Sequence, residues 1–159
     1  MSILLYRVDE RLIHGQVVVG WGSKLRPDQY LVVDTALAVS DWEQDLYTLG
    51  VPERVSVEFL APGTARTALE DWKESELRCV LLTRDLGTML ELARNGTLSG
   101  ESLNLGGLHH QKGREEILPY LFLDEADKQA LRELENEGLE ISARDLPGSP
   151  IVTLEDLLG

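Results

Sequence analysis

Apolar residues along this chain are grouped in short runs that mostly lack polar alternation. The runs cover residues 3–8, 30–33, 55–60, 80–82, 103–105, 118–123 and 139–142. Runs of this kind are typical of strands that are covered on both faces. Helical patterns lie between many of them, so strand and helix alternate. We therefore expect an α/β fold: a single domain over residues 1–159, with three α/β/α layers and a mainly parallel central sheet.

Three of the helical patterns have recognisable ends. Thr64 is expected to cap a helix whose apolar stripe continues to Trp72. Asp85 is expected to cap another helix that stops at Gly96, because glycine commonly ends helices. A third stripe spans residues 126–134 and predicts a helix with a solvated acidic face.

A further helix is predicted from Gly15 onward, although two glycines lie inside it. Gly20 and Gly22 each cost about 0.5–1 kcal/mol relative to alanine. Close packing of this helix against the sheet is the expected compensation. Trp21, between the two glycines, is expected to lie in the core.

Charge restricts the kind of partner. The net charge is −13, which argues against nucleic acid or an anionic membrane surface, since both attract basic patches. Residues 1–34 hold equal numbers of acidic and basic side chains, whereas residues 124–159 hold ten acidic and three basic ones, a sum of −7. A protein partner is therefore expected on the N-terminal surface. No membrane span or signal sequence is recognised, so a cytoplasmic protein is expected.

The segment of residues 7–16 carries the candidate chemistry. Ligands of parallel α/β sheets bind beyond the carboxyl ends of the strands, and this segment leaves the first predicted strand. His14 can act as a nucleophile toward phosphorus, and Arg7 and Arg11 can supply positive charge. Backbone amides at the expected helix start can hold further phosphoryl oxygens; they belong to Gly15, Gln16 and Val17. The same segment is also typical of a surface histidine without chemistry, because short motifs often match by chance.

Other polar residues near this segment leave alternatives open. Asp9 can orient Arg11 or the loop, or simply form a turn. His109 and His110 lie in a long loop, where they can contact a phosphate, face a partner or join His14 in a metal site. Adjacent histidines reach one ion only with strain, and no acidic or cysteine ligand stands at zinc-like spacing, so we expect no metal. Nucleotide-binding glycine motifs are missing from the sequence, and no cofactor is expected.

Several segments resemble one known family in the right order. Residues 6–18 (Tyr-Arg-Val-Asp-Glu-Arg-Leu-Ile-His-Gly-Gln-Val-Val) resemble the N-terminal signature of the IIB components of the mannose/fructose/sorbose-type sugar phosphotransferase system. Residues 31–34 and 81–83 are similar to the second and fourth strands of that family. Residues 103–107 and 112–114 resemble its late glycine loop. The resemblance covers nearly the whole chain.

The resemblance implies roles for individual residues. In the family, the residue that matches His14 carries a phosphoryl group on Nδ1, and the arginine that matches Arg11 helps to hold it. Asp34 matches the first of two acidic residues after the second strand, but Thr35 replaces the second, which leaves the role of this position open. Further supporting residues are expected around the site: Asp9 and Thr83, with Arg7 and His109 behind them.

The resemblance also implies a function. It predicts a protein-Nπ-phosphohistidine–sugar phosphotransferase subunit that accepts phosphate from a IIA phosphocarrier. The phosphate would pass to a sugar bound by the membrane subunits IIC and IID, which would recruit the protein to the inner face of the membrane. The family also allows a homodimer. The sequence alone leaves a second hypothesis open, a regulatory module that reports its phosphorylation state without a transport partner.

Overall fold

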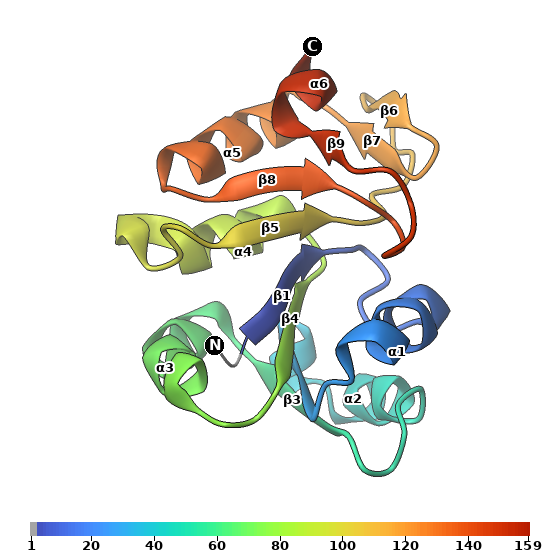
Figure 1. Cartoon of the computed structure of the whole chain (residues 1–159), viewed down its shortest axis with the longest axis vertical. Coiled ribbons are helices and arrows are strands. Elements are labelled where there is room, and N and C mark those ends of the chain that lie inside the picture. The colour runs from blue at the N-terminus through green and yellow to red at the C-terminus, as the bar shows by residue number, and fades with distance from the viewer. Residues whose placement is uncertain (1–2) are drawn as a thin grey trace.

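The computed structural model describes residues 3–159, and a seven-stranded sheet runs through its centre (Figure 1). The strand order is β3-β2-β4-β1-β5-β8-β9, and every neighbouring pair is parallel except β8 and β9. The strands are β1 (Ile3–Val8), β2 (Gln29–Val33), β3 (Ser56–Leu60), β4 (Cys79–Thr83), β5 (Ser102–Leu105), β8 (Glu140–Ala143) and β9 (Val152–Thr153). The expected mainly parallel sheet is confirmed.

Helices cover both faces of this sheet. The principal ones are α1 (Gly22–Leu25), α2 (Asp41–Thr48), α3 (Pro62–Glu74), α4 (Leu86–Ala93), α5 (Glu125–Asn136) and α6 (Leu154–Leu158). Shorter turns of other types are the π-helix η1 (Gln16–Trp21) and the 3-10 helices η2 (Leu37–Val39) and η3 (Arg94–Gly96). Figure 1 shows α3, α4 and α5 on one side of the sheet, with α1 and α2 on the other. The three-layer α/β/α architecture is therefore confirmed.

The two faces enclose separate hydrophobic cores, which the strands supply alternately. On β2, Leu31 and Val33 belong to the larger core under α3, α4 and α5, while Tyr30 and Val32 belong to the smaller one. Successive strand side chains point to opposite faces, so a strand buried on both faces is apolar along most of its length. That is the physical origin of the unalternating runs in the sequence.

The apolar run at residues 118–123 was predicted as one strand, and this was wrong. It belongs to a separate antiparallel hairpin of β6 (Glu115–Leu118) and β7 (Leu121–Leu123). Pro119 and Tyr120 form the turn between the two strands. Proline has no amide hydrogen to donate to a ladder, which explains why the run breaks there.

The ends of two helices differ in how well they were predicted. Thr64 does not cap α3, because the helix already begins at Pro62, a residue favoured at the first helical position. Asp85 does cap α4: its Oδ1 accepts a hydrogen bond from the Thr88 amide at 2.7 Å. The end of this helix was predicted too late: α4 stops at Ala93, and in the short turn η3 that follows Asn95 and Gly96 have positive φ values of 66° and 73°, which break the helical path. The stripe at residues 126–134 lies within α5, so that helix is confirmed.

The helix predicted after His14 is present, but it opens as a π-helix and packs partly on a loop. Gly22 faces the sheet, where an added Cβ would lie 3.1 Å from the Tyr30 hydroxyl. Gly20 instead faces the Leu146 side chain, 2.6 Å from an added Cβ, so its predicted packing on the sheet was wrong. Trp21 is buried, as expected. Throughout residues 3–159, each helix is too short or too polar to cross a membrane.

Candidate functional site

The His14 loop leaves the carboxyl end of β1, which lies between β4 and β5 near the middle of the sheet. Backbone hydrogen bonds tie the loop to both neighbours. The Asp9 amide donates to the Thr83 carbonyl at 3.0 Å, and the Glu10 amide donates to the Gly107 carbonyl at 2.8 Å. The loop is therefore fixed at the carboxyl ends of the central strands, where the sequence analysis expected a site.

The turn that positions His14 contains a strained backbone conformation. The Leu12 amide donates to the Asp9 carbonyl at 2.9 Å, and Leu12 has a φ of 55°, in the left-handed region. A non-glycine residue in such a conformation costs on the order of 1–3 kcal/mol. Leu12 is fully buried in the smaller core, and this burial offsets the strain. The loop thus has one favoured path between Asp9 and His14.

Asp9 is the centre of the site and is completely buried. Its Oδ2 lies 2.8 Å from Arg7 Nη2 and 3.1 Å from His14 Nε2. Its Oδ1 accepts from the Arg11 amide at 3.1 Å. This bond goes to the backbone of Arg11, so Asp9 holds the turn of the loop and does not contact the Arg11 side chain. The contact with the imidazole was in neither interpretation.

His14 presents its Nε2 to Asp9, and its Nδ1 has no hydrogen-bond partner among residues 3–159. Its side chain is 13% exposed. The approach of Nε2 to Asp9 is close in distance but falls short of a well-aligned hydrogen bond. A carboxylate beside Nε2 favours a proton on that nitrogen, so that the lone pair of the neutral ring lies on Nδ1. The backbone of His14 is also fixed, because its carbonyl accepts hydrogen bonds from the amides of Val17 and Val18.

The pKa of Asp9 reflects its surroundings. Burial raises it, but the contact with His14, the charge of Arg7 and the Arg11 amide outweigh that effect and lower the pKa to about 2. Asp9 is therefore an anion at neutral pH. A fixed negative charge behind the ring favours the imidazolium form that develops when the ring binds an electrophile.

Arg7 lies behind Asp9, where the sequence placed a supporting residue. Its guanidinium is fully buried and donates to Asp9, to the side chain of Asn104 and to the carbonyls of Arg144 and Asp145. It also lies 5.5 Å from the centre of the Trp21 ring. Burial lowers the pKa of Arg7, while Asp9 opposes that change. The charge of Arg7 acts on the site through Asp9 rather than on a ligand directly.

Arg11 is on the solvent side of the loop. Its Nη2 donates to Gln16 Oε1 at 3.0 Å, which holds the guanidinium beside the start of η1. Among residues 3–159, no group accepts a hydrogen bond from the amides of Gly15 or Gln16. The amide of Val17 was expected to be free as well, and this was wrong: it donates to the His14 carbonyl at 3.0 Å. This hydrogen bond between positions i and i+3 closes a tight turn at the start of η1 and uses the donor.

The glycine loop after β5 packs against the buried part of the site. A Cβ on Gly106 would collide with the guanidinium of Arg7 and with Asp9 Oδ2. Gly107 is next to Asp9 Oδ1 and to His109 Cε1. Glycine at position 106 therefore permits the close approach between this loop and the Arg7–Asp9 pair.

Glu10 connects the His14 loop to the glycine loop, and sequence reasoning missed it. Its Oε2 lies 2.6 Å from His109 Nδ1 and accepts from the His109 amide at 2.9 Å, while Oε1 accepts from Arg114 at 3.1 Å. Burial raises the pKa of Glu10, but the hydrogen bonds from His109 and Arg114 outweigh it and lower the pKa. His109 is 55% exposed, and His110 stands edge-on to Phe122, 5.6 Å between ring centres. The loop is thus held by carboxylate contacts.

Two other predicted site residues support strand ends instead of contacting His14. Asp34 accepts from Arg84 Nε at 2.9 Å and from the Leu37 amide at 3.0 Å, so it holds η2 and the segment after β4. The Thr83 hydroxyl donates to the Asp85 carbonyl at 2.9 Å. Thr83 adjoins the site through its carbonyl, which accepts from the Asp9 amide. Arg84 is a partly exposed cation near this edge that sequence reasoning did not identify.

The fold and the position of the imidazole define a class of protein. It is a three-layer α/β/α domain with a histidine side chain beyond the carboxyl end of its central strand. Residues 3–159 match the family described as "PTS system sorbose subfamily IIB component". The chain therefore belongs to the sorbose subfamily of IIB components, within the mannose-type phosphotransferase systems. It is accordingly a component of a sugar phosphotransfer system and a phosphotransferase in the general sense.

Individual relatives agree with this membership. The sorbose-specific EIIB component of Lacticaseibacillus casei is 28% identical over 150 residues, which cover 94% of this chain and 91% of that protein. The mannose-specific EIIAB component of Escherichia coli K12 is 27% identical over 158 residues, and this chain covers 49% of its length. The crystal structure of an N-acetylgalactosamine IIB component from Streptococcus pyogenes is 25% identical, with a TM-score of 0.88 over 98% of this chain and 97% of that one.

Proposed function

We propose that this protein is a phosphocarrier that accepts a phosphoryl group on Nδ1 of His14 from a phosphohistidine of a IIA partner. The observation that carries the proposal is the buried Asp9 carboxylate, 3.1 Å from Nε2 of His14. With Nε2 turned to an anion, Nδ1 remains as the nucleophile of the neutral ring. The second hypothesis, a regulatory module, has no separate observation in its favour.

The transfer step is a direct displacement at phosphorus. The lone pair of His14 Nδ1 forms the new P–N bond while the P–N bond to the donor's histidine breaks. The donor nitrogen keeps the electron pair of the broken bond and returns to a neutral imidazole. No oxidant, metal or further reactant is consumed, and catalysis consists of positioning and charge stabilisation. Asp9 stabilises the positive charge that His14 acquires while bonding.

Arg11 and the helix start would hold the phosphoryl oxygens. The Arg11 guanidinium is exposed and next to Gln16, so it can turn from Gln16 to an incoming phosphoryl group with two parallel donors. The free amides of Gly15 and Gln16 supply neutral donors close to the ring. Arg7 keeps Asp9 in place and does not take part in holding the phosphate.

The partners follow from the family. The phosphate would pass from His14 to a sugar bound by membrane subunits IIC and IID, at the cytoplasmic face of the membrane. The name of the mannose-specific relative joins A and B components in one protein. This supports a IIA protein as the donor for the present chain.

Intact-mass and phosphosite measurements test the proposal. The protein is incubated with phosphoenolpyruvate, the general phosphotransferase proteins and a IIA partner. One added phosphoryl group on His14, lost on transfer to sugar in membranes that hold IIC and IID, is the expected result. Phosphate on another residue would overturn the assignment. A stable phosphohistidine that no IIC/IID membrane discharges would instead support the regulatory hypothesis.

A further inference from the structure

An apolar surface lies beside the His14 loop and is not part of the site described above. It is formed by Val39 of η2 and by Trp42, Leu46 and Leu49 in and after α2, and we call it the α2 surface. These four side chains are between 58% and 84% exposed. The spacing of positions 42, 46 and 49 places them on one side of a helix. Contiguous exposed apolar side chains on a protein of this kind commonly mark an interaction site.

The helix that carries this surface is poorly buried. None of its eight residues, all of which the structure describes, is buried. It is attached through the Gln44 side chain, which donates to the Leu37 carbonyl at 2.7 Å, and through Tyr47, whose ring lies 6.5 Å from that of Phe59. Its outward apolar side chains thus contribute little to the fold. In the isolated chain these side chains remain exposed to solvent and available for contact with a partner.

The α2 surface is continuous with the transfer site. A hollow of about 490 Å³ joins the two, and its lining residues are Trp42, Glu43, Leu46 and Tyr47 from α2, Gly50, Arg84, and Ile13, the residue before His14. A Cβ on Gly50 would lie 3.5 Å from Ile13 Cγ2, so the end of the α2 segment touches the His14 loop. A protein that covers His14 with a typical contact of about 800 Å² must extend over neighbouring elements. The α2 surface is the apolar one that adjoins the loop.

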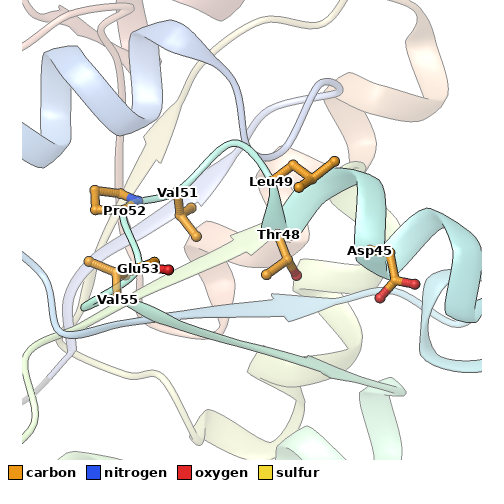
Figure 2. A pocket seen from close by; sticks show the side chains of 7 residues that line it. All are labelled: Asp45, Thr48, Leu49, Val51, Pro52, Glu53 and Val55. Atoms are coloured by element: carbon orange, nitrogen blue, oxygen red, sulfur yellow. The ribbon is translucent and has the colours of Figure 1, made fainter.

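A second hollow continues the surface at the far end of the helix. Figure 2 shows the side chains of Asp45, Thr48 and Leu49 along one wall, with Val51, Pro52, Glu53 and Val55 from the following loop along the other. Leu49 lines this second depression, whereas Trp42 and Leu46 line the first. Depressions that flank an exposed apolar ridge can receive side chains of a partner.

Charge decides which partner fits. α2 carries Asp41, Glu43 and Asp45 and no basic residue, and Arg84, the cation that lines the first hollow, is paired with Asp34. In a symmetric contact between two copies these carboxylates would face one another, which is unfavourable. An anionic lipid surface would be repelled in the same way. The surface suits a different protein, one that has apolar side chains rimmed by basic ones.

We propose that the α2 surface is the docking surface for the IIA donor, which would have an apolar area rimmed by basic side chains next to its phosphohistidine. This inference rests on the proposed function of His14 and adds where the donor binds. It also changes the expected location of the contact. Lys24 and Arg26 precede the amino end of β2, the opposite end of the strands from His14, so they do not border the site. The partner would instead contact the His14 loop and α2, which follows residues 1–34 in the chain.

The test compares a protein donor with a small one. Trp42→Ala and Leu46→Glu are assayed for single-turnover labelling from phosphorylated IIA and from phosphoramidate, a small phosphoryl donor that needs no docking surface. Leu77→Glu is the matched control, because Leu77 is 47% exposed and precedes the amino end of β4, away from His14. We expect at least about tenfold slower labelling from IIA at low IIA concentration for Trp42→Ala and Leu46→Glu, as for truncated aromatic anchors. Labelling from phosphoramidate, and both rates of Leu77→Glu, should match wild type.

Each alternative result has a definite meaning. Unchanged rates from IIA in both α2 variants, with His14 still labelled, would overturn the docking surface and leave the proposed function standing. Loss of labelling from phosphoramidate as well would show that the substitutions disturb the site itself, which also overturns the docking role. Normal labelling from IIA with slow discharge to sugar in IIC/IID membranes would assign the surface to the membrane subunits. Failure of wild-type His14 to accept phosphate from either donor would overturn the function and this inference together.

Discussion

The two faces of the sheet differ in how completely they are used for folding. Under α3, α4 and α5, leucine, valine and methionine side chains fill a continuous core. The other face has a smaller core, a buried Arg7–Asp9 pair and a helix, α2, with no buried residue. Polar burial and unused apolar surface both cost stability, so they are found where function requires them. This difference supports the proposal that one face is a scaffold and the other carries the chemistry and its partner.

The largest effect is expected from the site face. His14→Ala should abolish labelling by phosphorylated IIA, because His14 lies beyond the carboxyl end of the central strand β1, against the buried Asp9 carboxylate and beside the free amides of Gly15 and Gln16. His110→Ala is the control and should label normally, since His110 contacts Phe122 at a distance from Asp9. Mass spectrometry of the labelled proteins measures both. Residual phosphate on the His14 variant would place the chemistry elsewhere.

The scaffold face should dominate stability. Leu81 is fully buried in the larger core, and Leu81→Ala should lower the free energy of unfolding by about 2–5 kcal/mol. Leu46→Ala, on the α2 surface, should change it by no more than about 0.5 kcal/mol. Urea unfolding at constant slope gives both values. Similar losses for the two variants would mean that α2 is part of the scaffold after all.

Acid should act on the site face through Asp9. Its pKa is lowered in the folded protein to about 2 from an ordinary value of 3.8, so it contributes stability above pH 4 that is lost as the pH falls toward 2. The difference of nearly two pKa units corresponds to about 2 kcal/mol. The advantage of wild type over Asp9→Asn in free energy of unfolding should therefore shrink by about that amount between pH 7 and pH 2. Urea unfolding across this range would show it; a constant gap would contradict the assignment.

The smallest expected effect is on the transfer rate, and it distinguishes the charge of Arg11 from the geometry of its guanidinium. Arg11→Lys keeps the charge but loses two parallel donors, and it should slow single-turnover transfer from IIA about tenfold while the fold is preserved. Arg132→Lys, an exposed change on α5, provides the comparison and should transfer at the wild-type rate. Circular dichroism checks folding in both. Equal rates would remove Arg11 from the site.

Local patterns in the sequence were enough for the scaffold. Strands buried on both faces are apolar along most of their length, and this reveals β1, β2 and β4 without knowledge of their neighbours. The Asp85 cap and the stripe of α5 depend on residues within a few positions of each other, so they too can be found locally. The errors also have local causes: Pro62 began α3 earlier than Thr64, and Pro119 split one predicted strand into a hairpin.

What the sequence by itself determined was the order of elements, the edge of the sheet where the His14 loop emerges and the neighbourhood of His14 and Arg11. Tertiary structure decided the rest. Arg7 meets Asn104 and the Arg144 carbonyl, 97 and 137 positions away, and Glu10 meets His109 across 99 positions. The exposure of Trp42 likewise depends on what the fold leaves uncovered. Such contacts carry no periodic signal, because only the folded chain brings distant residues together.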